Sequence, residues 1–136
     1  MQHWGIEFLD DGCYGKQLNP KINEYTEKKY SYIPTSFVNE IADQKYLRDI
    51  TRTDKDIISN LIVSISRVGF LEPGWIVYDE SSVRLKDGNH RLIAALHLGL
   101  EKYPATFSKV ENISGGHKKI SDLFIKILEN QWLHPS

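Results

Sequence analysis

Cysteine is nearly missing from this chain of 136 residues, and long apolar runs are missing altogether. Because Cys13 is the one cysteine, an internal disulfide is impossible and a reducing compartment is favoured. No apolar stretch reaches the length of a membrane span, and "MQHWGIEFLDDG" lacks the basic start and apolar segment of a secretory signal. We therefore expect a cytoplasmic protein without a membrane partner, although export by a signal-independent machine would fit the same features.

An excess of charge of one sign is missing too. The 17 basic and 18 acidic residues give a formal net charge of −1, so the chain lacks the basic field that supports non-specific binding to nucleic acid. A local basic patch such as "EKKY" or "GGHKK" would still allow DNA as a partner, but the charge balance does not favour it. No repeat or long linker divides the chain, and its length predicts one domain over 1–136.

Metal-binding patterns are the third absence. The seven-residue separation of His90 and His97 is not completed by cysteines or carboxylates, and the other histidines show no ligand spacing. We expect no structural metal. The tryptophans are expected in the core or in docking contacts, and "SGGHKK" (114–119) is expected to be a flexible loop. The other histidines are His3, His117 and His134, and the tryptophans are Trp4, Trp75 and Trp132.

The first third of the chain predicts little regular structure. Residues 1–32 are expected to form an irregular extension, in which Ile6 and Phe8 alternate with polar neighbours as in a short strand and "DDGCYG" is a turn. The next segment, "YSYIPTSFVNEIADQKYL", leaves two structures open. Its tyrosines and Ile33 favour a strand, whereas Ser36 can cap a helix. That helix would carry Phe37, Ile41 and Leu47.

A long helix is predicted from Thr53 to the residue before Gly69. Thr53 and Asp56 make an approximate capping box, and Gly69 supplies the stop. Apolar residues recur at helical spacing between them and are expected to face the core. These are Ile57, Ile58, Leu61, Ile62, Ile65 and Val68.

Strands and helices alternate in the second half of the chain. "WIVYD" and "VRLK" flank a tight connection and predict a hairpin, and "YPATF" predicts a strand in which Pro104 suits the first position or an edge. A helix is predicted from about His90 to Leu98, with Gly99 as its stop, and a last helix over 120–131 is capped by Ser121. The last helix carries Leu123, Phe124, Ile127 and Leu128. The irregular alternation predicts a compact α+β domain.

The stretch "LKDGNHRLIAALHLG" collects polar and charged residues at the start of a helix. The first turn of a helix leaves backbone N–H groups unpaired and carries a partial positive charge, so a strand, a glycine and a helix start together form an anion site. Gly88 allows close backbone approach, and Asn89 can cap the helix or bind a ligand. His90 can shuttle a proton, and Arg91 offers a fork for phosphate oxygens.

A purely structural role for these residues is equally open. Asp87 and Gly88 can form a turn, after which Asn89 caps the helix. His90 is then a satisfied surface residue, and Arg91 pairs with Asp87.

Residues 54–107 resemble the ParB/sulfiredoxin superfamily. Its pattern is a helix ending in S/T-I, then G-x-x-x-P, a hairpin, G-x-H/R-R at a helix start, A-A, a Leu-Gly and a Pro-led strand. This sequence supplies Ser64-Ile65, Gly69, Pro73, Gly88, His90-Arg91, Ala94-Ala95, Leu98-Gly99 and Pro104 in that order. The resemblance implies a compact domain with a small mixed sheet, helices and a phosphate-binding loop at a helix N-terminus.

Members of the superfamily bind nucleoside triphosphates through that loop. The resemblance therefore implies that ATP or CTP binds with Mg²⁺ at the loop, and that Ser64 and Asn60 face the nucleotide. Ser64 and Asn60 fit a polar surface stripe equally well, and for Asn60 the surface stripe is favoured. The loop residues are Asp87, Gly88, Asn89, His90 and Arg91.

Two activities of the superfamily are disfavoured by departures from its pattern. Sulfiredoxin chemistry requires a cysteine between the glycine and the histidine, where this chain has Asn89. Chromosome-partition ParB proteins carry E-N-x-x-R and a later helix-turn-helix domain, whereas "ENISG" (111–115) lacks the arginine and few residues follow.

The remaining D-G-x-H-R subgroup includes free-serine kinases and small ParB-like proteins described as nucleases or NTPases. It implies an enzyme that hydrolyses a nucleoside triphosphate or transfers a phosphoryl group, with His90 and Arg91 as candidate catalytic residues. Glu72 is the candidate base, with Glu40 and Asp87 as alternatives. A DNA nuclease or toxin and a non-catalytic binding or inhibitor protein stay open as other functions.

Overall fold

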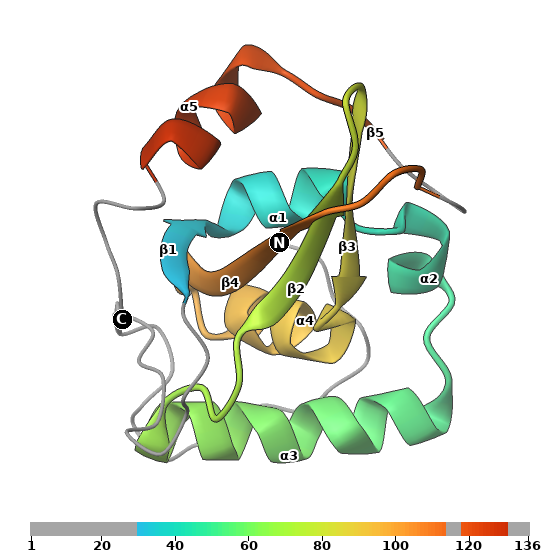
Figure 1. Ribbon diagram of the computed structural model, residues 1–136. Coiled ribbons are helices and arrows are strands. Elements are labelled where there is room, and N and C mark those ends of the chain that lie inside the picture. Colours follow the sequence, from blue (N-terminus) through green and yellow to red (C-terminus); the bar gives the residue numbers. More distant parts are fainter. Residues whose placement is uncertain (1–29, 114–117, 131–136) are drawn as a thin grey trace.

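The computed structural model describes residues 30–113 and 118–130 and has mixed α+β architecture (Figure 1). No helix in this part of the chain is both long and apolar enough to cross a membrane. The predicted α+β class with a small mixed sheet is confirmed. The strands are β1 (Ser31–Pro34), β2 (Gly74–Tyr78), β3 (Ser82–Asp87), β4 (Lys102–Lys109) and β5 (Lys118–Lys119). The helices are α1 (Thr35–Ile41), α2 (Gln44–Arg48), α3 (Arg52–Val68), α4 (Asn89–His97) and α5 (Asp122–Asn130).

The sheet has the strand order β1-β4-β2-β3-β5. Its one parallel pair joins β2 to β4, and the other neighbours are antiparallel. In Figure 1, α4 lies between the strands and α3, and it is the connection that returns the chain from β3 to β4. The start of α4 therefore sits where β3 ends, beside α3 and the beginning of β2.

The predicted hairpin is confirmed as β2 and β3, in register from Tyr78 opposite Val83. Its turn forms because the Asp79 carboxylate accepts hydrogen bonds from the backbone N–H groups of Ser81 and Ser82. The expected place of Pro104 is wrong. It is the third residue of β4, a central strand, opposite Tyr32. Pairing with β2 begins only at the next residue, so the N–H that proline lacks is not needed on that side.

The predicted start of the long helix is also wrong by two residues. The sequence contains two overlapping T-x-x-D pairs, and α3 uses the first. Thr51 is the N-cap, its hydroxyl accepts from the Asp54 N–H at 3.1 Å, and Asp54 accepts from the Thr51 N–H at 2.8 Å. Asp54 gains further partners from other helices, described below, which the Thr53 and Asp56 pair does not have. The stop at Gly69, with φ of 81°, is confirmed.

The ambiguous segment contains both a strand and helices, one after the other. β1 is followed directly by α1, whose N-cap is Pro34 without a side-chain bond, so Ser36 is not the cap. Leu47 belongs to α2, a separate helix that Asp43 caps by accepting from two backbone N–H groups.

The core lies between the sheet and the helices. α3 contributes Ile58, Ile62 and Ile65, each at most 6% exposed. The expectation that Ile57 and Val68 also face the core is wrong, since they are 40% and 52% exposed. The last helix is confirmed, and Ser121 accepts from the Phe124 N–H at its start. Phe124 docks this helix through ring contacts with the following residues: Phe37, Tyr78 and Phe107.

Several expectations fall outside the described residues. These are the strand at Ile6 and Phe8, the turn at Cys13, and the places of His3, His117, His134, Trp4 and Trp132. Lys118 and Lys119 pair with β3, so the end of "SGGHKK" is a strand rather than a loop. Trp75 is 38% exposed on β2, where Lys86 lies over its ring and Ser108 accepts from its indole N–H. The single domain over 1–136 stays a prediction.

Candidate functional site

The start of α4 is built on a glycine in the left-handed region. Gly88 has φ of 108° and is the N-cap residue, and its carbonyl accepts the first helical bond from the Leu92 N–H. A β-carbon at this position would lie 2.4 Å from the Tyr103 hydroxyl and 3.0 Å from the Gly74 α-carbon. Only glycine fits both the backbone angle and this close approach.

Tyr103 joins the α4 start to the sheet. Its side chain is fully buried, and its hydroxyl donates a 2.8 Å hydrogen bond to the Gly88 carbonyl. Burial raises the pKa of this phenol, which therefore remains a donor. The helix start is thus held rigidly against β4 and the beginning of β2.

No side chain caps this helix end. The N–H groups of residues 89–91 have no acceptor within α4, since they belong to its first turn. Asn89 does not cap the helix, and its Oδ1 is buried without a hydrogen-bond partner, whereas its expected role in ligand binding stays a prediction. The α4 N-terminus therefore keeps the unpaired donors and partial positive charge that favour an anion.

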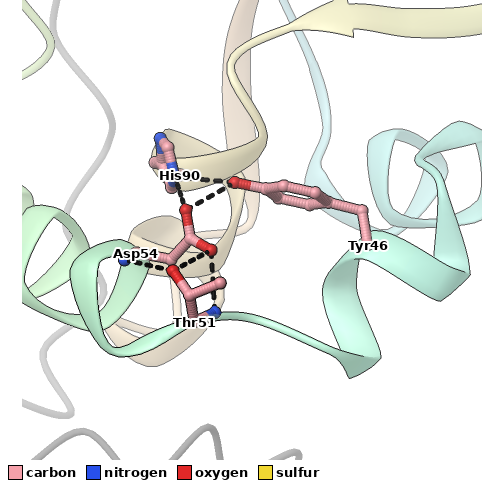
Figure 2. A network of polar contacts seen from close by, with 4 residues as sticks. All are labelled: Tyr46, Thr51, Asp54 and His90. Carbon is pink, nitrogen blue, oxygen red and sulfur yellow. Dashed lines mark hydrogen bonds and ion pairs between the residues drawn. The ribbon is translucent and has the colours of Figure 1, made fainter.

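Asp54 is the centre of a polar network that joins three helices, and His90 belongs to it (Figure 2). The Nε2 of His90 is 2.8 Å from Oδ1 of Asp54 on α3 and 2.7 Å from the hydroxyl of Tyr46 on α2. The Tyr46 hydroxyl also donates to Asp54 Oδ1 at 3.1 Å. The second carboxylate oxygen, Oδ2, accepts from the backbone N–H and hydroxyl of Thr51, both at 2.8 Å.

The network keeps Asp54 ionised. Its pKa lies well below the usual range, first because of the hydrogen bond with His90 and then because of those from Thr51. The pKa of Tyr46 is raised to about 12, mainly by burial and then by its bond to the Asp54 carboxylate. Asp54 is therefore an acceptor for all its partners, and Tyr46 is a donor.

The contacts assign the proton on His90. A lone pair on Nε2 would face the Asp54 carboxylate at 2.8 Å, whereas an N–H there makes a charge-assisted hydrogen bond. Nε2 is therefore the protonated nitrogen, and in the neutral ring Nδ1 carries the lone pair. The side chain is 31% exposed, and no described residue bonds to Nδ1. His90 thus has a free, oriented basic nitrogen.

Arg91 points its guanidinium at the loop before β2. Its Nη1 donates to the carbonyls of Glu72 at 3.1 Å and Pro73 at 2.5 Å, and Nη2 lies 3.5 Å from the Asp87 carboxylate. These bonds fix the loop to the helix start. Arg91 therefore has a structural task in this state, and its phosphate-binding role stays a prediction.

The other expected residues lie around the network without joining it. Glu72 is exposed, and it is its backbone carbonyl that contacts Arg91. Asp87 is the last residue of β3, with its side chain 67% exposed. Ser64 is half-buried and Asn60 is exposed on α3, and neither side chain bonds to α4. Glu40 is exposed on α1.

Three members of the network were missed in the sequence: Tyr46, Thr51 and Asp54. The T-x-x-D pattern of Thr51 and Asp54 was available as a signal for a helix start. Nothing in the spacing indicates that Tyr46, 44 residues before His90, would reach the same carboxylate.

The described residues do not form a resident magnesium cage. Within 30–113 and 118–130, no group of three or more His, Cys, Asp or Glu side chains could hold a metal ion. Both oxygens of Asp54 are already engaged by protein donors. Magnesium therefore enters the proposal below only as part of a magnesium–nucleotide substrate, whose phosphates and water supply its ligands.

A separate hollow lies at the other end of the hairpin. It has a volume of about 600 Å³ and is lined by Asp79, Glu80, Ser81, Lys109, Val110, Glu111 and Asn112. None of the residues of the network lines it, so it is distinct from the α4 start.

Comparison with known proteins gives a likeness in fold and no match in sequence families. A scan of protein-family models and a search of curated proteins find no match. The fold is similar to "Crystal structure of Sulfiredoxin from Arabidopsis thaliana", with 17% identity and a TM-score of 0.49 over 76% of this chain and 96% of that chain. Sulfiredoxin belongs to the superfamily that the sequence resembles. The likeness concerns the fold alone and carries no inference about activity, ligands or site residues.

Proposed function

We propose that this protein transfers the terminal phosphoryl group of a magnesium–nucleoside triphosphate to water or a small hydroxyl compound at the start of α4. The observation that carries the proposal is the hydrogen bond between Asp54 and His90 beside an uncapped helix N-terminus. His90, held by Asp54, supplies an oriented base, and the helix N-terminus supplies hydrogen-bond donors for phosphate oxygens.

His90 is the base in this reaction. The attacking hydroxyl gives its proton to Nδ1 as its oxygen bonds to the γ-phosphorus. The bond from that phosphorus to the bridging oxygen breaks, and the electron pair leaves with the nucleoside diphosphate. The Asp54 carboxylate then stabilises the imidazolium through the 2.8 Å bond at Nε2.

The helix start binds the phosphates. The N–H groups of residues 89–91 point out of the first turn and meet phosphate oxygens, where the helix dipole favours negative charge. Arg91 adds a positive charge close to this turn. Its side chain is 17% exposed, so its attraction for an anion is less screened than that of a surface arginine.

An apolar surface on α3 suits a nucleobase. Ile57 and Val68 are 40% and 52% exposed, and Leu71 in the following loop is 53% exposed. Ile57 and Val68 share a side of α3 with Ser64, at helical spacing and about three turns apart along the helix. The base is expected to pack on part of this side of α3, with Ser64 and Asn60 as hydrogen-bonding partners.

Turnover followed by ³¹P NMR tests the proposal. The protein is incubated with ATP or CTP and Mg²⁺, with and without free serine as one hydroxyl acceptor. Conversion of the γ-phosphate signal into inorganic phosphate or a phosphoester supports the proposal if His90→Gln slows it roughly 10²-fold or more. Glu111→Gln, in the hollow at the far end of the hairpin, is the matched control and keeps full activity. Equal rates for wild type and His90→Gln would refute the role of His90.

A further inference from the structure

The phenol of Tyr46 completes a triangle of contacts with Asp54 and His90. The three edges are 2.7 Å to His90 Nε2, 3.1 Å to Asp54 Oδ1, and 2.8 Å between Nε2 and Oδ1. Tyr46 comes from α2, a helix that contributes no other residue to the network (Figure 2). We propose that Tyr46 is a positioning residue that fixes the Nε2–H tautomer of His90, so that Nδ1 is the nitrogen that acts on the substrate.

Only one placement of the hydrogens makes all three contacts of the triangle attractive. If the phenol donates to Oδ1 and Nε2–H points between Oδ1 and the phenol oxygen, two hydrogens cover all three edges. If Nε2 lacked its hydrogen, the single phenol O–H could donate a hydrogen bond either to Nε2 or to Oδ1, but not to both. The nitrogen lone pair would then face a carboxylate at 2.8 Å. The phenol therefore adds a second acceptor for Nε2–H and penalises the other tautomer.

Tyr46 also restricts the orientation of the imidazole ring. The two rings meet edge to face, with centroids 5.9 Å apart and planes at 63°. A flip of the imidazole would move Nε2 away from both oxygens. Since its pKa of about 12 keeps the phenol protonated at neutral pH, the restriction holds where an enzyme would work.

α2 is itself anchored in a defined place. Asp43 caps its first turn, and the side-chain amide of Gln44 donates to the Asn39 carbonyl at 2.6 Å. Tyr46 therefore approaches the network from a fixed helix rather than from a loop. The part of the inference that concerns the substrate rests on the proposed phosphoryl transfer, whereas the tautomer is a property of the protein without ligand.

¹⁵N NMR of the histidine ring nitrogens tests the inference in the unliganded protein. Spectra are recorded at a pH where the imidazole is neutral, and the His90 signals are identified by their loss in His90→Gln. In wild type we expect a protonated Nε2 and an unprotonated Nδ1. In Tyr46→Phe we expect the ratio of the Nε2–H tautomer to the Nδ1–H tautomer to fall roughly threefold to tenfold, the effect of about one net hydrogen bond. Circular dichroism checks that the fold is kept.

Tyr78→Phe is the matched control, because it removes the same hydroxyl at the far end of β2. It is expected to leave the His90 signals unchanged. A wild-type ring protonated at Nδ1, or a Tyr46→Phe spectrum equal to that of wild type, would overturn the inference. Titration of the same samples with magnesium–ATP separates the two proposals: the expected tautomer shift without any nucleotide binding contradicts the function and leaves the positioning role intact.

Discussion

The imidazole of His90 and the carboxylate of Asp54 lie 2.8 Å apart, although 36 residues separate them in the chain. The contact joins the first turn of α4 to the first turn of α3, so two helix starts meet at one hydrogen bond. Asp54 serves both turns, as a member of the capping box of α3 and as the partner of the histidine. A change at this carboxylate is therefore expected to affect both stability and chemistry.

Asp54→Asn should lower the free energy of unfolding at pH 7 by about 2 kcal/mol, the combined effect of a weakened cap and a weakened hydrogen bond with His90. The native pKa of Asp54 lies below the unfolded value of about 3.9. Its contribution is therefore fully present above that value and is lost as the pH falls below it. Urea unfolding of both proteins at pH 7 and pH 3 checks this. A stability difference that does not shrink at pH 3 would contradict the depressed pKa.

Gly88→Ala should be more destabilising than Gly99→Ala. Both glycines have positive φ, 108° and 69°, so both variants acquire backbone strain of about 1–2 kcal/mol. Only at Gly88 does the new methyl group meet a neighbour, the Tyr103 hydroxyl at 2.4 Å, whereas nothing lies within 4 Å at Gly99. Thermal or chemical unfolding measures the difference. Equal losses would show that Tyr103 does not restrict this position.

Tyr103→Phe tests the same contact from the other side. On its own it should destabilise the protein by about 1 kcal/mol or more, because the Gly88 carbonyl loses its buried donor. In combination with Gly88→Ala, it removes the atom that the methyl group would meet. The double variant should therefore be more stable than the sum of the two single losses predicts. Strict additivity in the double-mutant cycle would argue against a direct clash.

Glu72→Gln and His90→Gln distinguish the two candidate bases. Glu72 is exposed, whereas His90 is oriented by an anionic partner. If the protein turns over a nucleoside triphosphate, His90→Gln should reduce kcat roughly 10²-fold or more, the usual contribution of a positioned base. Glu72→Gln should leave kcat within about twofold of wild type, since it removes no proton acceptor from the step. A larger loss of kcat in Glu72→Gln than in His90→Gln would show that the Glu72 carboxylate is the base.

Much of the fold could be predicted because local patterns decide it. The hairpin follows from alternating residues around a turn, and the ends of α3 and α4 follow from Gly69 and Gly99. The start of α3 could not be fixed, because two T-x-x-D pairs compete and the contacts of Asp54 with His90 and Tyr46 favour the first. Pro104 was placed wrongly, because its tolerance depends on where a neighbouring strand begins.

The candidate site was found in part. The glycine, histidine and arginine of the α4 start were recognisable as a local cluster. The roles that the structure gives them depend on distant residues, such as the carbonyls that hold Arg91 and the carboxylate that orients His90. Tyr46 and Asp54 precede the cluster by more than 30 residues, and no period or spacing links them to it. Pairing across helices of this kind becomes visible only when the helices are packed.

Amide chemical shifts of ¹⁵N-labelled protein, followed during titration with magnesium–ATP, test the central claim most directly. The account predicts that the largest shifts occur at the N–H groups of Asn89, His90 and Arg91, with smaller ones along the exposed side of α3. Unchanged spectra, or shifts gathered at the hollow around Asp79 and Glu111, would contradict a nucleotide site at the start of α4.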